Sequence, residues 1–215
     1  MINSILKSNK LTFFILLVFL SWLIQFISSE FLFTEDVWYS TYGEQLTIEQ
    51  IDGLLEWNLE YWWFAYVLVP IILGIKVILI TLALIIGAVL FDISLSFSKT
   101  MGVVIIAEYI FLIPSFFQLF WFSTITNVTT ITDMVSFTPW TLWYYLDHEE
   151  LMQWVNYPLN LVNLFELFFI ISLTFFTKKF LVEEDQNAYK IVLYGYGSGL
   201  LTWAIFISFL SIQYS

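Results

Sequence analysis

The chain has 215 residues, of which 60% are hydrophobic and 12% are charged, and its formal net charge at pH 7 is −11. Soluble domains carry about 25% charged residues, so a soluble core could not enclose this much apolar surface, and the composition predicts a protein whose solvent is lipid. The lack of cysteine excludes disulfides and thiolate chemistry, and the lack of arginine, with the negative charge, argues against a nucleic-acid partner.

Five apolar stretches each approach or exceed the roughly 20 residues that a membrane-spanning helix needs. They cover residues 11–28, 63–91, 101–123, 158–177 and 190–212. The first follows two lysines, as in a signal peptide, but its apolar run is long for that role and no small-residue cleavage motif follows it. We therefore interpret it as an uncleaved anchor and expect one all-α domain over residues 1–215, a bundle of five transmembrane helices.

Lysines near the ends of these spans predict the orientation of the chain. If the spans alternate in direction, all six fall on one side, and cytoplasmic loops are enriched in lysine. The N-terminus is then cytoplasmic and the C-terminus outside. A composition rich in Ile, Phe and Leu is typical of AT-rich genomes and favours a bacterial inner membrane. The six residues are Lys7, Lys10, Lys99, Lys178, Lys179 and Lys190.

The two segments expected outside, residues 29–62 and 124–157, are acidic. They contain no lysine and twelve of the 18 carboxylates. The simplest interpretation is a solvated surface. The alternative is a mouth that attracts cations, or a docking face for a basic partner.

Two amphipathic helices are predicted at the outer interface. Thr47 and Gln50 have the spacing of a capping box, which marks a helix start. Apolar residues then recur at helical spacing as far as Trp62, so this helix would lie in the interface and lead into the second span. A second interfacial helix would follow Pro139. The expected outer interfacial contacts are Ile48, Ile51, Leu55, Trp62 and Trp143.

Three ionisable residues, Lys76, Glu108 and Glu166, fall inside the second, third and fourth spans, each near the expected midplane. A charge at this depth is costly, so such side chains face the interior of a bundle and find partners. Lys76 could pair with either carboxylate. The functional interpretation is an ion or proton relay or a polar substrate site. The alternative is a structural ion pair, or a lysine that extends to the membrane surface.

Glycine and proline interrupt three of the spans. Pro70 and Gly87 lie in the second span and Pro114 in the third. They predict kinks and close helix packing, or a broken helix of the kind that binds solutes in transporters. Gly195 and Gly199 have the G-x-x-x-G spacing of a helix-packing motif, which suits contacts within the chain and oligomerisation equally.

No motif of a known catalytic site is present. His148 is the only histidine, and its neighbours Asp147, Glu149 and Glu150 would diverge from it on a helix, so we expect a solvated side chain and no metal site. The sequence also lacks G-x-S-x-G, a Walker A motif and a strand-linked G-x-G-x-x-G. We therefore expect neither an enzyme nor a cofactor.

Several local patterns are shared with one family. They open the third span, lie within it, precede the fourth span and lead into the fifth. The positions are residues 94–102, Tyr109, Pro114, Leu146, Asp147, residues 159–165 and the segment from Lys178 to Lys190. From about residue 80 onward, the chain resembles the Yip1 family of small polytopic membrane proteins, including its bacterial members. The resemblance implies five spans, a cytosolic N-terminus and a non-enzymatic role in membrane organisation or trafficking through protein contacts.

Three functions remain as expectations. The first is a non-enzymatic subunit or scaffold of a membrane complex, with the lipid bilayer and a membrane-protein partner or a second copy as its contacts. The second is a small transporter or channel component that uses Lys76, Glu108 and Glu166. The third is an intramembrane enzyme, which would need two convergent polar groups beside a substrate opening.

Overall fold

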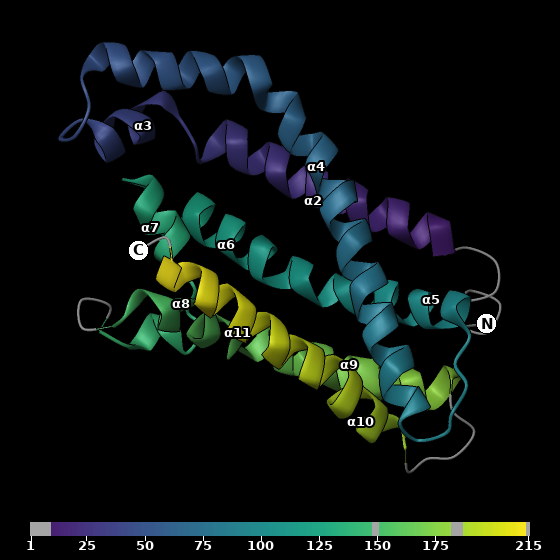
Figure 1. Cartoon of the computed structure of the whole chain (residues 1–215). Helices are drawn as coiled ribbons and strands as arrows, with labels where there is room; N and C mark the ends of the chain where they lie inside the picture. The colour runs from purple at the N-terminus through teal and green to yellow at the C-terminus, as the bar shows by residue number, and fades with distance from the viewer. Residues whose placement is uncertain (1–9, 148–150, 182–186, 214–215) are drawn as a thin grey trace. The chain divides into compact units, whose positions relative to one another are not determined.

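In the computed structural model, residues 10–147, 151–181 and 187–213 are described, and every named element among them is helical (Figure 1). In chain order the elements are α2 (Lys10–Phe31), α3 (Glu35–Tyr42), α4 (Ile48–Val89), α5 (Phe97–Glu108), the 3-10 turn η1 (Tyr109–Phe111), α6 (Leu112–Thr124), α7 (Ile131–Ser136), the 3-10 turn η2 (Trp143–Tyr145), α8 (Gln153–Leu161), α9 (Leu164–Phe180), α10 (Ala188–Ile191), the π-helical η4 (Val192–Gly197) and α11 (Ser198–Gln213).

Four helical segments are long and apolar enough to cross a membrane: Lys10–Phe31, Ile48–Val89, Phe97–Thr124 and Ala188–Gln213. They coincide with four of the five predicted spans, and the protein is a helical membrane protein. The remaining predicted span corresponds to α9, a helix of 17 residues. At 1.5 Å per residue it is about 26 Å long, slightly short of the roughly 30 Å hydrocarbon core.

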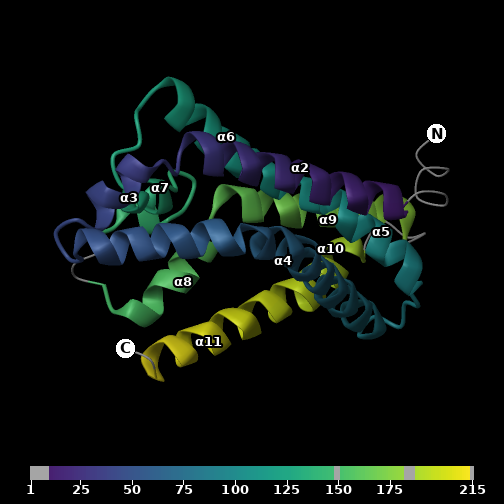
Figure 2. The same cartoon turned by 90° about the horizontal axis from the view of Figure 1, so that it is seen from above.

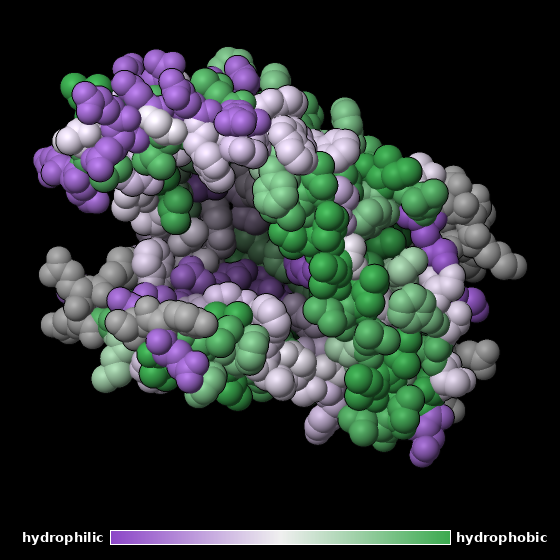
Figure 3. Space-filling view, turned by 45° about the horizontal axis from the view of Figure 1, so that its top comes forward, coloured by the Kyte–Doolittle hydropathy of each residue, from purple (hydrophilic) through white to green (hydrophobic). Residues whose placement is uncertain are grey.

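The α4 helix is one continuous element of 42 residues. It is about 63 Å long, twice the thickness of the hydrocarbon core. It follows the predicted capping box, in which the Thr47 N–H donates to Gln50 Oε1 at 3.0 Å. The helix predicted before the second span is therefore the first half of α4. The second half presents many exposed hydrophobic side chains, which form a continuous apolar stretch on the surface (Figure 3).

The described chain divides into two compact units. The first contains residues 10–15, 74–110 and the described residues from 138 onward, and the second contains residues 16–73 and 111–137. The boundaries fall inside α2, inside α4 and within η1, so three continuous helical segments contribute to both units. No change in composition or linker sequence marks these positions, and a single domain over residues 1–215 stays a prediction.

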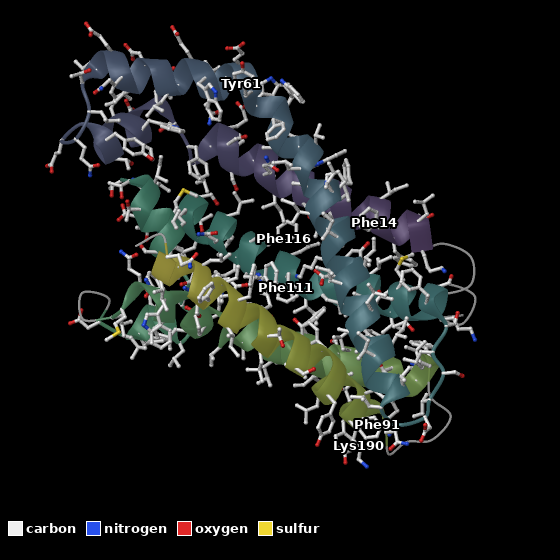
Figure 4. All side chains as sticks on the ribbon, viewed as in Figure 1. Phe14, Tyr61, Phe91, Phe111, Phe116 and Lys190 are labelled. Carbon is white, nitrogen blue, oxygen red and sulfur yellow. The ribbon has the colours of Figure 1, made fainter. Side chains whose placement is uncertain are left out.

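The first unit is a bundle of the second half of α4 with α5 and α8–α11. α5 packs against α9, and α11 lies beside α8, as the second view also shows (Figure 2). A hydrogen bond of 2.7 Å from Trp203 Nε1 to the Tyr157 hydroxyl joins α11 to α8. At the far end of α4, Phe91 and Lys190 lie together (Figure 4), with the ammonium 5.9 Å from the ring centroid. These contacts hold the helices that carry the polar site described below.

The second unit has a small core of its own, built from α2, α6 and α7. Its buried members are Leu32, Phe122 and Met134, with Trp121 and Phe137 packed against them. α3 packs against α7. The stretch after α6, residues 126–130, has no regular structure, and the chain becomes helical again at α7.

The segment after Pro139 differs from the predicted interfacial helix. Only the short turn η2 forms there, and the first long helix is α8. The backbone of this segment bonds elsewhere: the Leu142 N–H donates to the Val162 oxygen at 2.9 Å, and the Leu164 N–H donates to the Trp140 oxygen at 3.0 Å. These bonds use backbone groups that a helix would need, so the strand-like pairing replaces it.

Candidate intramembrane polar site

An ion pair joins α4 to α5 inside the first unit. Lys76 Nζ lies 2.8 Å from Glu108 Oε2. Glu108 is 2% exposed, whereas 39% of the lysine side chain is accessible, so the carboxylate is enclosed and the ammonium stem reaches the surface of the helices. The structure thereby selects Glu108 as the hydrogen-bonded partner of Lys76. The ammonium also lies 5.8 Å from the ring centroid of Phe169 in α9.

Glu166 occupies the first turn of α9 and bonds to a different group. Its backbone N–H donates to Asn163 Oδ1 at 2.7 Å, so Asn163 is the N-cap of α9. Its carboxylate accepts a hydrogen bond of 2.5 Å from the Tyr196 hydroxyl. A carboxylate in the first turn is favoured by the helix dipole, and Asn163 with Tyr196 fixes its position. The Lys76 ammonium attracts both Glu108 and Glu166 electrostatically.

Tyr196 is the site residue that the sequence analysis missed. It lies in η4, its ring meets that of Phe169 edge to face at 5.2 Å, and both residues are buried. Tyr196 lies between Gly195 and Gly197, and the sequence of this stretch was considered only as a helix-packing motif. The available signal was a phenol inside an apolar helix, since a buried tyrosine hydroxyl usually has a hydrogen-bond partner.

Each carboxylate or phenol of the site lies at an interruption of regular helix. Glu108 is the last residue of α5, directly before η1. Pro114 lies four residues after Ile110 and cannot donate to its carbonyl, which explains the 3-10 geometry at η1. Glu166 follows the break between α8 and α9, and Tyr196 lies in the π-helical segment. Such π segments occur frequently at functional sites.

One oxygen of the site has no hydrogen bond. Glu108 Oε1 is buried and has no partner within the described residues. Most buried polar atoms in proteins are paired, so an unpaired carboxylate oxygen calls for an explanation in a ligand, a proton or water. The site thus has one acceptor left over beside an otherwise complete network.

The other predicted positions contribute no polar group to this site. Gly195 packs against Gly87 and Ala83 of α4, whereas Gly199 has only an ordinary contact with Ala83. Of the predicted outer contacts, Ile51 is buried, Leu55 and Trp143 are half-buried, and Ile48 and Trp62 are exposed. Lys7, His148, Glu149 and Glu150 lie outside the described residues.

Comparison with known proteins gives no relative: no family model, no curated protein and no solved structure matches the chain.

Proposed function

We propose that the protein is a non-enzymatic subunit or scaffold of a membrane complex, and that the first half of α4 is the surface that binds its partner. The observation that carries the proposal is the exposure of large apolar side chains on this part of α4, with Trp57 at 62% and Leu59 at 72%. Exposed apolar patches rimmed by polar groups are typical of interaction sites. Exposed carboxylates at Glu49, Glu56 and Glu60 lie on the same part of α4.

A protein partner explains this surface better than a lipid surface does. Helices that lie on membranes carry Lys and Arg on the polar face, because many membranes are anionic. The first half of α4, residues 48–68, contains no basic residue and four carboxylates. It would be repelled by anionic lipid, whereas a partner with lysine or arginine beside an apolar groove complements both of its features.

Copurification from native membranes in mild detergent tests this proposal. A stoichiometric partner should accompany the wild-type chain and be lost when Trp57 and Leu59 are both replaced by alanine. The matched control is Ile72→Ala, an exposed apolar residue in the second half of α4. A partner that is retained by the Trp57/Leu59 variant, or a wild-type chain that purifies alone, would rule out this surface as the contact.

For the topology we propose five spans, with α9 as the fourth in chain order and with the N-terminus in the cytoplasm of a bacterial cell. The lysine distribution supports this orientation. A helix slightly shorter than the hydrocarbon core can cross it by local thinning of the bilayer. The same layout belongs to the Yip1 family, and membership would assign the complex to membrane organisation or trafficking.

A second candidate function, a component of a small transporter or channel, is favoured by one observation. Three helix interruptions, at η1, at residues 162–163 and at η4, adjoin Glu108, Glu166 and Tyr196 in a single unit. Discontinuous helices that meet at polar groups are typical of solute sites in transporters. Ion or solute flux into proteoliposomes that is lost in Glu108→Gln and Glu166→Gln, but kept in Glu56→Gln, would support this function.

A further inference from the structure

The charges of the polar site do not balance. Two carboxylates, Glu108 and Glu166, lie near a single ammonium, that of Lys76. Tyr196 is neutral, since its hydroxyl keeps its proton and donates a hydrogen bond to Glu166. With both carboxylates ionised, the site would therefore carry one uncompensated negative charge inside apolar helices, which is unfavourable.

Among the residues that the structure describes, the other lysines of the first unit lie too far along their helices to neutralise this charge. Lys178 lies twelve residues after Glu166 on the same helix, which is about 18 Å. Lys10 bonds to Ser98 near the start of α5, ten residues before Glu108 or about 15 Å. Lys190 lies over the ring of Phe91, at the end of the unit beyond α4.

The unpaired oxygen of the site belongs to one of the two carboxylates, that of Glu108. Glu108 Oε2 accepts from Lys76, while Oε1 is buried without a partner in the described chain. Two carboxylates that interact in a low-dielectric interior cannot readily both ionise, and such a pair holds one proton between its two members. A proton removes the excess charge and converts one acceptor into a donor.

We propose that Glu108 and Glu166 together bind one exchangeable proton, so that the site is neutral when loaded and carries one negative charge when empty. A metal cation fits less well, because the Lys76 ammonium is 2.8 Å from the other oxygen of Glu108 and would repel it. Groups that face the pair are Lys76 from α4 and Tyr196 from η4, and the ring of Phe169 from α9 lies against both of them. This site is independent of the proposed partner surface and requires no transport.

Infrared spectroscopy of the full chain in lipid nanodiscs tests the proposal by counting protons. At neutral pH the exposed carboxylates are ionised, so a protonated-carboxyl C=O band reports buried groups. We expect a band equivalent to one carboxyl per chain in the wild type, shifted on transfer to ²H₂O.

Charge counting then predicts the variants. Glu108→Gln and Glu166→Gln each leave one carboxylate opposite Lys76 and should abolish the band. Lys76→Met leaves two carboxylates without a cation and should double it. The control is Glu56→Gln, at an exposed position in the first half of α4, which should leave the band unchanged.

Three results would overturn the proposal: no band in the wild type, a band that persists in both glutamine variants, or a wild-type band that added Na⁺ abolishes. The last would assign the site to a metal cation. The first and third need only the wild-type chain, so they remain decisive even if a variant fails to fold.

Discussion

Gly87 in α4 and Gly195 in η4 approach so closely that a Cβ atom built on Gly87 would lie 2.7 Å from the Gly195 Cα. A Cβ on Gly195 would in turn lie 2.4 Å from the backbone oxygen of Ala83. Both distances are shorter than van der Waals contact, and the opposing atoms belong to backbone, which cannot rotate away. The pairing of these two glycines therefore sets the distance between α4 and η4.

We predict that Gly195→Ala lowers the stability of the first unit by about 1–3 kcal/mol, the usual cost of overpacking. Gly199→Ala is the matched control, because its Cβ would lie 3.6 Å from the Ala83 Cβ, an ordinary contact. Thermal unfolding in detergent compares the two. Equal melting temperatures for both variants would show that α4 and η4 separate at little cost.

The ion pair gives a second prediction. Lys76→Met leaves the buried Glu108 carboxyl without its hydrogen-bond donor, and breaking a buried pair costs about 3–5 kcal/mol. Because 39% of the lysine side chain is exposed, solvent screens the pair, and we expect Lys76→Met to lower the free energy of unfolding by only about 2–3 kcal/mol. The double variant Lys76→Met/Glu108→Gln removes both charges and should recover part of this loss in the same unfolding measurement. A double variant less stable than Lys76→Met would contradict this account.

Much of the helical layout could be predicted from sequence, because it depends on local composition. Four predicted spans coincide with long apolar helices, and α4 follows the Thr47–Gln50 motif. The choice between Glu108 and Glu166 as the partner of Lys76 could not be predicted, because it depends on how each helix is rotated about its axis. Sequence periodicity is weak evidence of rotation where a helix is apolar on every face.

The helix interruptions at η1, at residues 162–163 and at η4 were harder to predict, each for a different reason. Pro114 predicts a distortion of the helix, and the 3-10 turn before it forms because proline has no backbone N–H. The break at Asn163 depends on two hydrogen bonds over 20 or more residues, from the Leu142 N–H to Val162 and from the Leu164 N–H to Trp140, which no local pattern encodes. The π segment around Tyr196 likewise has no short sequence signature.

The chain lacks cysteine, so single-cysteine variants can test the number of spans without background labelling. If α9 also crosses the membrane, so that the chain has five spans, Asn58→Cys and Gln213→Cys lie on the same side of the membrane, and Lys99→Cys lies on the other. A membrane-impermeant maleimide added to intact cells should then label the first two positions and spare the third. Labelling of Asn58→Cys without Gln213→Cys would instead indicate four spans.

The cap of α7 links the second unit to pH. The Asp133 carboxylate accepts from the Thr129 hydroxyl and, at 2.9 Å, from the Thr130 N–H. The hydrogen bond from the Thr129 hydroxyl is the main cause that holds the pKa of Asp133 below its usual range. Because the pKa of Asp133 is lower in the folded state, the cap stabilises α7 at pH values above the pKa of an unfolded aspartate, which is about 4. This contribution is lost as the pH falls through the folded value.

We therefore predict that α7 loses hydrogen-exchange protection on acidification before the core around Phe122 does. Asp133→Asn keeps an acceptor oxygen but carries no titrating charge, so its protection factors in α7 should be lower at neutral pH and insensitive to acid. Thr130→Ala removes the reciprocal hydrogen bond to the Asp133 N–H and should weaken the cap by about 0.5–2 kcal/mol at neutral pH. Exchange followed by mass spectrometry on peptides that cover α7 measures all three chains. If the wild type and Asp133→Asn lose protection in parallel as the pH falls, the acid sensitivity of α7 arises from another group.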